Sequence, residues 1–244
     1  MGFLKCGYFI VMFFIMTLLT TFSLIILDFL YKVVGKTIPA KVAHGFGLFW
    51  GRAIMSLTPG WGVRINGREN LPTDDLAYVI VANHESATDI FTIYLLGIHF
   101  VWLSKVEIFR VPFLGRCMKI CRYVPVKRGD KDSHKEALQL CAERLRQRIP
   151  VLFFPEGTRS LDGKPKPFKI GAFKLALDEK VPVLPVVLSG AGRLLKKGGV
   201  CPSDAVLHIQ VLPLVYAHEN EGVEAYTERV QNIIVREHEK LEHK

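Results

Sequence analysis

A histidine and an aspartate, five positions apart, directly follow an apolar segment of the sequence. The segment covers residues 76–82, and His84 and Asp89 come next. The carboxyl ends of strands in an open α/β sheet are where ligands and reactive groups collect. An imidazole titrates near neutral pH, so His84 can take a proton from an alcohol and return it to a leaving group. Asp89 can fix the tautomer of that imidazole and support its charged form.

The nucleophile that would complete a Ser-His-Asp triad has no signature in this chain. No Gly-x-Ser-x-Gly elbow occurs. The sequence therefore predicts that the nucleophile belongs to the substrate. The competing interpretation is structural, with Asn83 as a turn residue and Asp89 as the N-cap of an apolar helix over residues 90–96.

A second polar motif, residues 155–160 (PEGTRS), follows the apolar run 151–154. Its proline ends a strand, and its glycine lets the backbone approach a ligand closely. The guanidinium of Arg159 is a planar fork that suits a phosphate or a carboxylate, and the Thr158 hydroxyl is a further donor. The motif predicts an anion-binding loop. A tight turn with a solvated arginine is the alternative.

Together, the two motifs resemble the glycerolipid acyltransferase family, and within it the small bacterial type of 1-acyl-sn-glycerol-3-phosphate acyltransferase. Residues 105–115 and 181–186 are similar to the second and fourth sequence blocks of that family. The resemblance extends from about residue 67 to residue 188. It is weak before residue 61 and after residue 192.

The resemblance implies transfer of an acyl chain from an acyl thioester to the 2-hydroxyl of lysophosphatidic acid (1-acyl-sn-glycerol-3-phosphate), giving phosphatidic acid for phospholipid biosynthesis. The donor is acyl carrier protein or acyl-CoA, and neither a metal nor a bound cofactor is required. His84 is the implied general base and Asp89 its orienting partner. Backbone N–H groups near Gly157 are the implied oxyanion donors. The implied substrate-binding residues are Lys105, Glu156, Gly157, Thr158 and Arg159, with Arg159 and then Lys105 assigned to the acceptor phosphate.

Three other functions remain compatible with the motifs. One is an acyltransferase that uses glycerol-3-phosphate or another lysophospholipid. Another is a lipid hydrolase with water as the acceptor. The third is a non-enzymatic membrane module that binds anionic lipid, which would leave His84 and Asp89 without a role.

The N-terminal sequence predicts a two-helix membrane anchor. Residues 8–27 contain no charged residue, and twenty helical residues reach about 30 Å, the thickness of a bilayer core. Residues 40–57 mix aromatic and basic side chains, as membrane-interface segments do. The pair can form a hairpin within one leaflet, or one spanning helix followed by an interfacial one. We expect residues 1–60 to be the anchor and residues 61–244 the catalytic domain.

The charge of the chain agrees with a lipid surface. The net charge of +9 is concentrated in blocks such as residues 105–128 and 159–174. A membrane anchor beside basic blocks favours anionic lipid over nucleic acid, for which no recognition motif is present. The expected location is the inner (cytoplasmic) membrane, with the catalytic domain on the cytoplasmic face.

The rest of the chain alternates between strand and helix patterns. This alternation predicts an α/β fold with a largely parallel sheet flanked by helices. Strands are expected over 100–103, 123–126, 183–188 and 206–212, and helices over 111–120, 132–148, 171–178 and 221–242, with Asp132 and Ser133 as the cap of the second. The five cysteines show neither Cys-x-x-Cys nor zinc spacing, which predicts a reducing compartment for the catalytic region and a packing role for Cys117 and Cys121.

Overall fold

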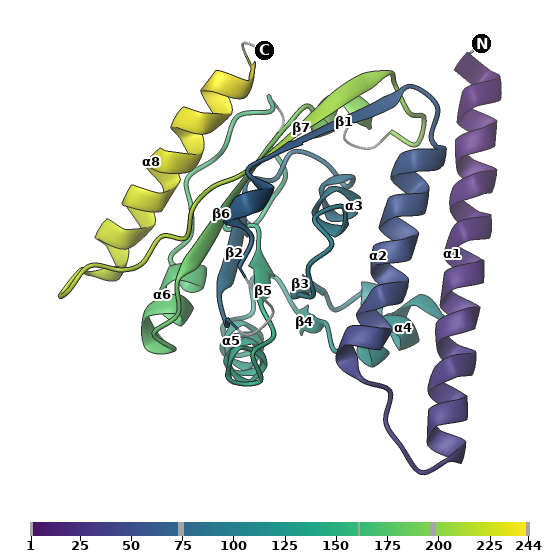
Figure 1. Cartoon of the computed structure of the whole chain (residues 1–244), viewed down its shortest axis with the longest axis horizontal. Coiled ribbons are helices and arrows are strands. Elements are labelled where there is room, and N and C mark those ends of the chain that lie inside the picture. The colour runs from purple at the N-terminus through teal and green to yellow at the C-terminus, as the bar shows by residue number, and fades with distance from the viewer. Residues whose placement is uncertain (1, 73–75, 161, 196–198, 243–244) are drawn as a thin grey trace.

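One mixed sheet lies at the centre of the molecule (Figure 1). The computed structural model describes residues 2–72, 76–160, 162–195 and 199–242. Within these residues the sheet has seven strands in the order β1-β7-β6-β2-β5-β3-β4. The strands are β1 (Trp61–Asn66), β2 (Val79–Ala82), β3 (Val101–Lys105), β4 (Val124–Val126), β5 (Val151–Phe153), β6 (Val183–Ser189) and β7 (Ala205–Val211). Only the β6–β7 pair among them is antiparallel.

Helices cover both faces of this sheet. They are α1 (Gly2–Val33), α2 (Ala40–Leu57), α3 (Asp89–Tyr94), α4 (Leu114–Ile120), α5 (Lys131–Arg146), α6 (Gly171–Asp178), α7 (Ala191–Leu194) and α8 (Val223–Glu242), with short 3-10 turns η1 (Arg68–Asn70) and η2 (Ile108–Arg110). Figure 1 shows α5, α6 and α8 on one face, and α1, α2 and α3 on the other. The predicted α/β class, with a largely parallel sheet flanked by helices, is confirmed.

The central strand β2 shows why its sequence is continuously apolar. Val79 and Val81 pack into the core cluster that includes α5, α6 and α8, whereas Ile80 and Ala82 pack into the cluster that includes α3. All four side chains are fully buried. Because successive side chains of a strand point to opposite faces, a strand covered on both faces needs no polar position. The first polar residues therefore follow directly where β2 ends.

Some elements differ from their predicted forms. Strand β1 was not predicted, although its apolar residues Trp61, Val63 and Ile65 alternate with less apolar ones, as in an edge strand with one buried face. Helix α5 is capped by Asp130, whose side chain accepts the Ser133 N–H at 3.1 Å, and not by Asp132 and Ser133. The N-cap residue must lie before the first helical residue, and that residue is Lys131.

The two predicted N-terminal helices are present and pack against each other (Figure 1). Among the described residues, only α1 is long and apolar enough to cross a membrane. Gly51 of α2 serves a packing role. A Cβ added at Gly51 would lie 2.7 Å from the Cβ of Tyr94, so this glycine allows α2 to approach α3 closely.

Both ends of α1 contact the rest of the protein. Near the N-terminal end, Lys5 forms an ion pair with Asp204. Nearer the C-terminal end, Arg116 of α4 forms an ion pair with Asp28 at 3.9 Å, and between these points the Cys117 thiol donates to the Thr21 carbonyl at 3.5 Å. Helix α1 therefore lies along the body of the protein over most of its length. Its outward side chains form a broad apolar face, which includes Leu4, Val11, Phe14, Leu18, Leu19, Ile26, Phe29 and Leu30.

A disulfide joins Cys6 of α1 to Cys201 in the loop before β7. The sequence did not predict this bond, since the cysteine spacings favoured a reducing compartment for the catalytic region. The partners are 195 residues apart, and sequence spacing does not show that folding brings them together. The packing role of Cys117 and Cys121 is confirmed, since both are buried free thiols.

Oxidised protein is expected to yield one cross-linked peptide pair, Cys6 with Cys201. Reduction should lower the free energy of unfolding by about 2–5 kcal/mol, because the bond closes a long loop of the unfolded chain. Peptide mass spectrometry identifies the bond, and denaturant unfolding with and without reductant measures its effect. Cys6→Ser should behave as the reduced protein does in both conditions. A midpoint of unfolding that is independent of reductant would contradict the bond.

Candidate active site

The two polar motifs meet at the carboxyl edge of the sheet. Strands β2 and β5 are parallel neighbours, so the loops that follow them leave the sheet side by side. The His84 N–H donates to Glu156 Oε1 at 2.9 Å, and the Ser160 N–H donates to the His84 carbonyl at 2.8 Å. The structure therefore joins two segments that are some seventy residues apart in sequence into one site.

The side chains of His84 and Asp89 form a direct contact. His84 Nδ1 lies 2.7 Å from Asp89 Oδ2. A carboxylate accepts, so Nδ1 carries the proton and Nε2 keeps a lone pair. The His84 side chain is 14% exposed, whereas Asp89 is fully buried. This arrangement is that of a general base whose orienting carboxylate is shielded from water.

Asp89 also fixes the backbone of the loop that carries His84. Its Oδ2 accepts the N–H groups of Glu85 at 2.8 Å and Ser86 at 2.9 Å. Both residues precede α3, and Asp89 is the first residue of that helix, with Thr88 at the N-cap position. The alternative interpretation of Asp89 as a helix N-cap is therefore wrong.

The ring of Phe154 supports the imidazole from one side. The two ring centroids are 4.2 Å apart and the planes are 20° from parallel. Sequence reasoning placed Phe154 at the end of a buried strand and assigned it no role in the site. Its contact with His84, together with the Asp89 bond, leaves the imidazole little rotational freedom.

Glu156 lies beneath the loop rather than on its surface. Burial raises the pKa of its carboxyl to about 7, although the hydrogen bond from the His84 N–H by itself lowers this pKa. Its second oxygen, Oε2, is buried without a hydrogen-bond partner among the described residues. The observed contacts tie Glu156 to the backbone of His84.

The remaining residues of the second motif form its turn and its exposed side. Gly157 has a φ of +72°, and its N–H donates to the Phe154 carbonyl at 3.0 Å, so this N–H is already used. Thr158 is exposed and Arg159 is half-buried. Within the described part of the chain, the Arg159 guanidinium has no hydrogen-bond or ion-pair partner, while its carbonyl accepts Lys166 Nζ at 2.9 Å. The fork of Arg159 therefore remains available to a ligand.

Lys105 lies at the carboxyl end of β3, next to β5 in the sheet. It is exposed and makes no hydrogen bond or ion pair with the described residues of either loop. The structure thus places Lys105 at the same edge as the site without linking it to His84 or Arg159. Among the described residues, no group of three or more His, Cys, Asp or Glu side chains could hold a metal ion.

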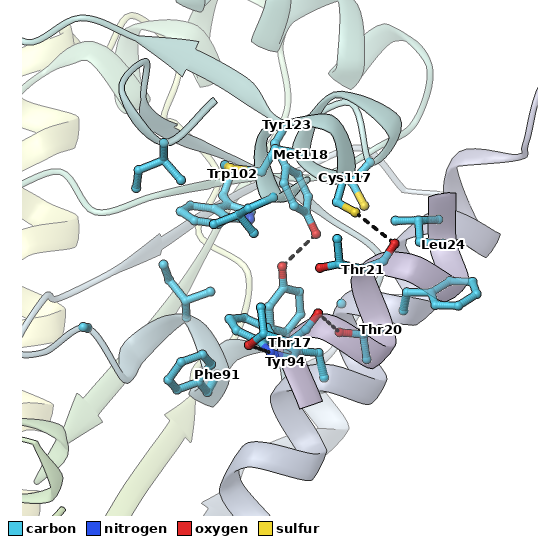
Figure 2. A pocket seen from close by; sticks show the side chains of 18 residues that line it. Thr17, Thr20, Thr21, Leu24, Phe91, Tyr94, Trp102, Cys117, Met118 and Tyr123 are labelled. Atoms are coloured by element: carbon cyan, nitrogen blue, oxygen red, sulfur yellow. Dashed lines mark hydrogen bonds between the residues drawn. The ribbon is translucent and has the colours of Figure 1, made fainter. Parts of the chain in front are cut away.

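An apolar cavity of about 250 Å³ adjoins the catalytic loop (Figure 2). Ala87 and Ile90, on either side of Asp89, line one part of it. Its other walls come from α1, α2, α3 and α4, and include Thr17, Thr20, Thr21, Leu24, Trp50, Phe91, Cys117 and Met118. The helices predicted as an anchor therefore also build the cavity.

A buried polar chain crosses the cavity wall. Figure 2 shows the hydroxyls of Tyr94 and Tyr123 pointing toward one another, and their oxygens are 2.7 Å apart. Burial lowers the pKa of His44 to about 3, so its ring is neutral. Because His44 Nε2 donates to the Ile98 carbonyl at 3.1 Å, its Nδ1 accepts from Tyr123, whose oxygen then accepts from Tyr94. The chain of bonds satisfies these polar groups without exposing a free donor to the cavity.

The sequence interpretation did not predict that α1 lines a cavity beside the site. A signal was nevertheless present in the spacing of its threonines. Thr17, Thr20 and Thr21 stand at i, i+3 and i+4, so they share one helix face, which is the face turned toward the protein. Trp50 Nε1 donates to Thr17 Oγ1 at 3.0 Å and fixes this face against α2.

Known proteins share both the sequence and the fold of this chain. A solved structure of the 1-acyl-sn-glycerophosphate (LPA) acyltransferase PlsC from Thermotoga maritima matches with a TM-score of 0.80 and 26% identity, covering 100% of this chain and 97% of that one. The chloroplastic 1-acyl-sn-glycerol-3-phosphate acyltransferase BAT2 of Brassica napus is 41% identical over 158 residues, which are 65% of this chain and 45% of that protein. A Helicobacter pylori 1-acyl-sn-glycerol-3-phosphate acyltransferase is 38% identical over 119 residues, covering 47% of this chain and 49% of that protein.

The matches with the curated relatives therefore span about half of those proteins' length. The model of the Acyltransferase family matches residues 62–189, just over half of the chain, and this segment contains both loops of the site. On these grounds the chain belongs to the Acyltransferase family.

Proposed function

We propose that this protein transfers an acyl chain from a thioester to the 2-hydroxyl of 1-acyl-sn-glycerol-3-phosphate, producing phosphatidic acid. The observation that carries the proposal is the position of the His84–Asp89 pair, between an apolar cavity and the loop of Arg159. The names of the relatives support the same acceptor. The donor is acyl carrier protein or coenzyme A, and the reaction needs no metal or cofactor.

In the proposed mechanism, His84 Nε2 removes the proton of the acceptor hydroxyl. The alkoxide oxygen attacks the thioester carbonyl carbon, and the resulting tetrahedral intermediate breaks its C–S bond. The proton on Nε2 then passes to the leaving thiolate. Asp89 stabilises the imidazolium that forms between these steps.

The oxyanion of the intermediate requires donors at fixed positions. The Gly157 N–H is bonded within its own turn, so we assign this role to the next two backbone N–H groups, of Thr158 and Arg159. Neither has a hydrogen-bond partner among the described residues. Glu156 has a positioning role, since it holds the backbone of His84 against this loop.

The apolar cavity is proposed to bind the acyl chain that is transferred or already esterified. The apolar lining would bury the methylene groups of the acyl chain close to His84. Each methylene buried there contributes about 0.8 kcal/mol to the free energy of binding. Residues 1–60 would then act as a membrane anchor and as one wall of the lipid site, with residues 61–244 as the catalytic domain. The exposed apolar face of α1 continues at Phe113, whose ring lies 5.1 Å from that of Phe22.

The proposed location is the cytoplasmic face of the inner membrane, where thioester donors are made. Because α1 bonds to the same body of the protein at Lys5 and again at Asp28, a one-leaflet arrangement is favoured over a spanning one. Thiols trapped in intact cells should then be found reduced at Cys6 and Cys201, since cytosolic thiols reduce exposed disulfides. If Cys6 and Cys201 are fully disulfide-bonded in freshly trapped cells, the side of the protein that carries them lies outside the cytosol.

The function is tested by thioester consumption in the presence of 1-acyl-sn-glycerol-3-phosphate. Thiol release should require the acceptor and should match phosphatidic acid formation one to one. Donors of different chain lengths and with each carrier identify the substrate pair. Thiol release without the acceptor would indicate a hydrolase, and no release with any donor would contradict the proposal.

Arg159→Ala should raise the KM for the phosphorylated acceptor by about ten- to a hundred-fold, with little change in the KM for the thioester. A charge-assisted hydrogen bond contributes about 1.5–3 kcal/mol, which corresponds to this range. Arg159→Lys should restore only part of the affinity because the planar fork is lost. Steady-state kinetics with each substrate varied in turn measure both constants.

The matched control is Lys164→Ala, which removes a cation from the same exposed segment. It should leave both KM values within about two-fold, since exposed charges contribute little. An equal effect of the two variants would reduce the role of Arg159 to general surface charge. Lys105→Ala is the corresponding test of the second phosphate-binding residue.

A further inference from the structure

Glu85, the residue after His84, is a buried carboxylate with several donors. It is 6% exposed. Its Oε2 accepts the N–H groups of Gly190 and Gly192, both at 3.1 Å, at the N-cap and in the first turn of α7. Its Oε1 lies 3.1 Å from His238 Nε2. The carboxylate thus joins the catalytic loop to two other parts of the chain.

His238 belongs to α8, outside the segment that the family model matches. It is 1% exposed and lies near the C-terminal end of the helix. Figure 1 shows α8 against the face of the sheet opposite to α3, the helix that begins with Asp89. Since Glu85 accepts, His238 Nε2 must carry a proton in this contact. Nothing in the proposed reaction uses this histidine.

We infer that His238 is a positioning residue, which acts through Glu85 to hold His84 at the geometry that the reaction needs. The inference rests on the proposed role of His84 as the general base. Asp89 fixes the ring and the N–H groups of residues 85 and 86 from the α3 side. Glu85 and His238 fix the same loop from the α8 side, so that the loop is held from both faces of the sheet.

The chemistry of Glu85 explains why a histidine is placed there. Burial raises the pKa of the Glu85 carboxyl, the bond from His238 lowers it, and the nearby Asp89 raises it. A proton on Oε1 would remove the acceptor for His238, and a proton on Oε2 would compete with the Gly190 and Gly192 N–H groups. His238 therefore favours the ionised form, which accepts from all of these donors at once.

The test compares two substitutions of His238 in the full-length protein. His238→Leu removes the donor and should lower kcat by about ten- to a hundred-fold, because a displacement of about 1 Å has effects of this size. The KM for either substrate should change by less than about three-fold, since neither site is touched. His238→Gln places an amide nitrogen at the position of Nε2 and should restore most of kcat.

A matched control lies on the same helix. Thr227 is similarly buried, but its hydroxyl donates within α8, to the Val223 carbonyl at 2.7 Å. Thr227→Val should leave kcat unchanged. Coupling is measured with Glu85→Gln: if the residues act as a pair, Glu85→Gln combined with His238→Leu should lower kcat no more than the stronger single substitution.

The outcomes separate this inference from the proposed function. If wild-type protein transfers the acyl chain but His238→Leu retains normal kcat, or loses no more than Thr227→Val does, the positioning role is wrong. If His238→Leu does not fold, the comparison of His238→Gln with His238→Asn tests the inference, since only the Gln side chain reaches the position of Nε2. Equal kcat values for these two variants would overturn the inference. If wild-type protein shows no transfer, the proposed function itself fails.

Discussion

His84→Ala is expected to lower kcat by about 10²–10⁴-fold while the protein stays folded and membrane-bound. The substitution removes the imidazole whose Nδ1 contacts the buried Asp89 carboxylate and whose Nε2 is free to take a proton. The backbone of residue 84 keeps its bonds to Glu156 and Ser160, so the loops should remain joined. Single-turnover kinetics with a bound thioester measure the chemical step directly.

The control for this variant is His134→Ala, since His134 is an exposed histidine of α5. It should retain normal kcat and the same midpoint of unfolding. Trapping of an acylated side chain in the wild-type enzyme would falsify direct transfer from thioester to acceptor. Turnover of His84→Ala close to that of the wild type would remove this histidine from the mechanism.

Asp89→Asn is expected to lower kcat on the order of 10³–10⁴-fold. The amide oxygen can still accept the Glu85 and Ser86 N–H groups, so the loop keeps its shape. The Nδ1 proton of His84 shares this same oxygen, and an uncharged amide oxygen that already accepts two N–H groups holds the proton far less strongly than the carboxylate does. The ring then adopts the tautomer with the proton on Nε2, and the base no longer has a lone pair where the acceptor hydroxyl binds.

Imidazole NMR on protein with labelled histidine distinguishes this explanation from a general loss of structure. The nitrogen shifts of His84 should report the exchanged tautomer, whereas the other histidine signals should be unchanged. Asp132→Asn, which changes an exposed carboxylate of α5, should alter neither the spectrum nor kcat. A wild-type tautomer in Asp89→Asn together with low activity would assign the loss to another cause.

The local elements were predictable because they depend on local patterns. The apolar runs around residues 79–82 and 151–153 became central strands, and the polar motifs after them became the loops of the site. The boundaries of α6 also follow from its sequence, over residues 171–178. Edge strand β1 was missed because its signal is a short alternation of apolar and polar residues, which is weaker than the continuous apolar run of a central strand.

The arrangement of those elements was decided by the tertiary structure. Periodicity reports that a residue is buried but not which residue buries it. Bonded partners come from distant positions in the chain: Glu85 and His238 are 153 residues apart, and Cys6 and Cys201 are 195 apart. Only the packing of the whole chain brings such groups within bonding distance.

The sequence by itself therefore determined which candidate reactive groups this protein carries, with His84 and Asp89 after one strand and Arg159 after another. The tertiary structure decided that β2 and β5 are neighbours, which makes one site of two motifs. It also decided that α1 and α2 close an apolar cavity beside that site. A residue type fixes what a group can do, whereas the distance between two groups depends on every contact that the folded chain makes.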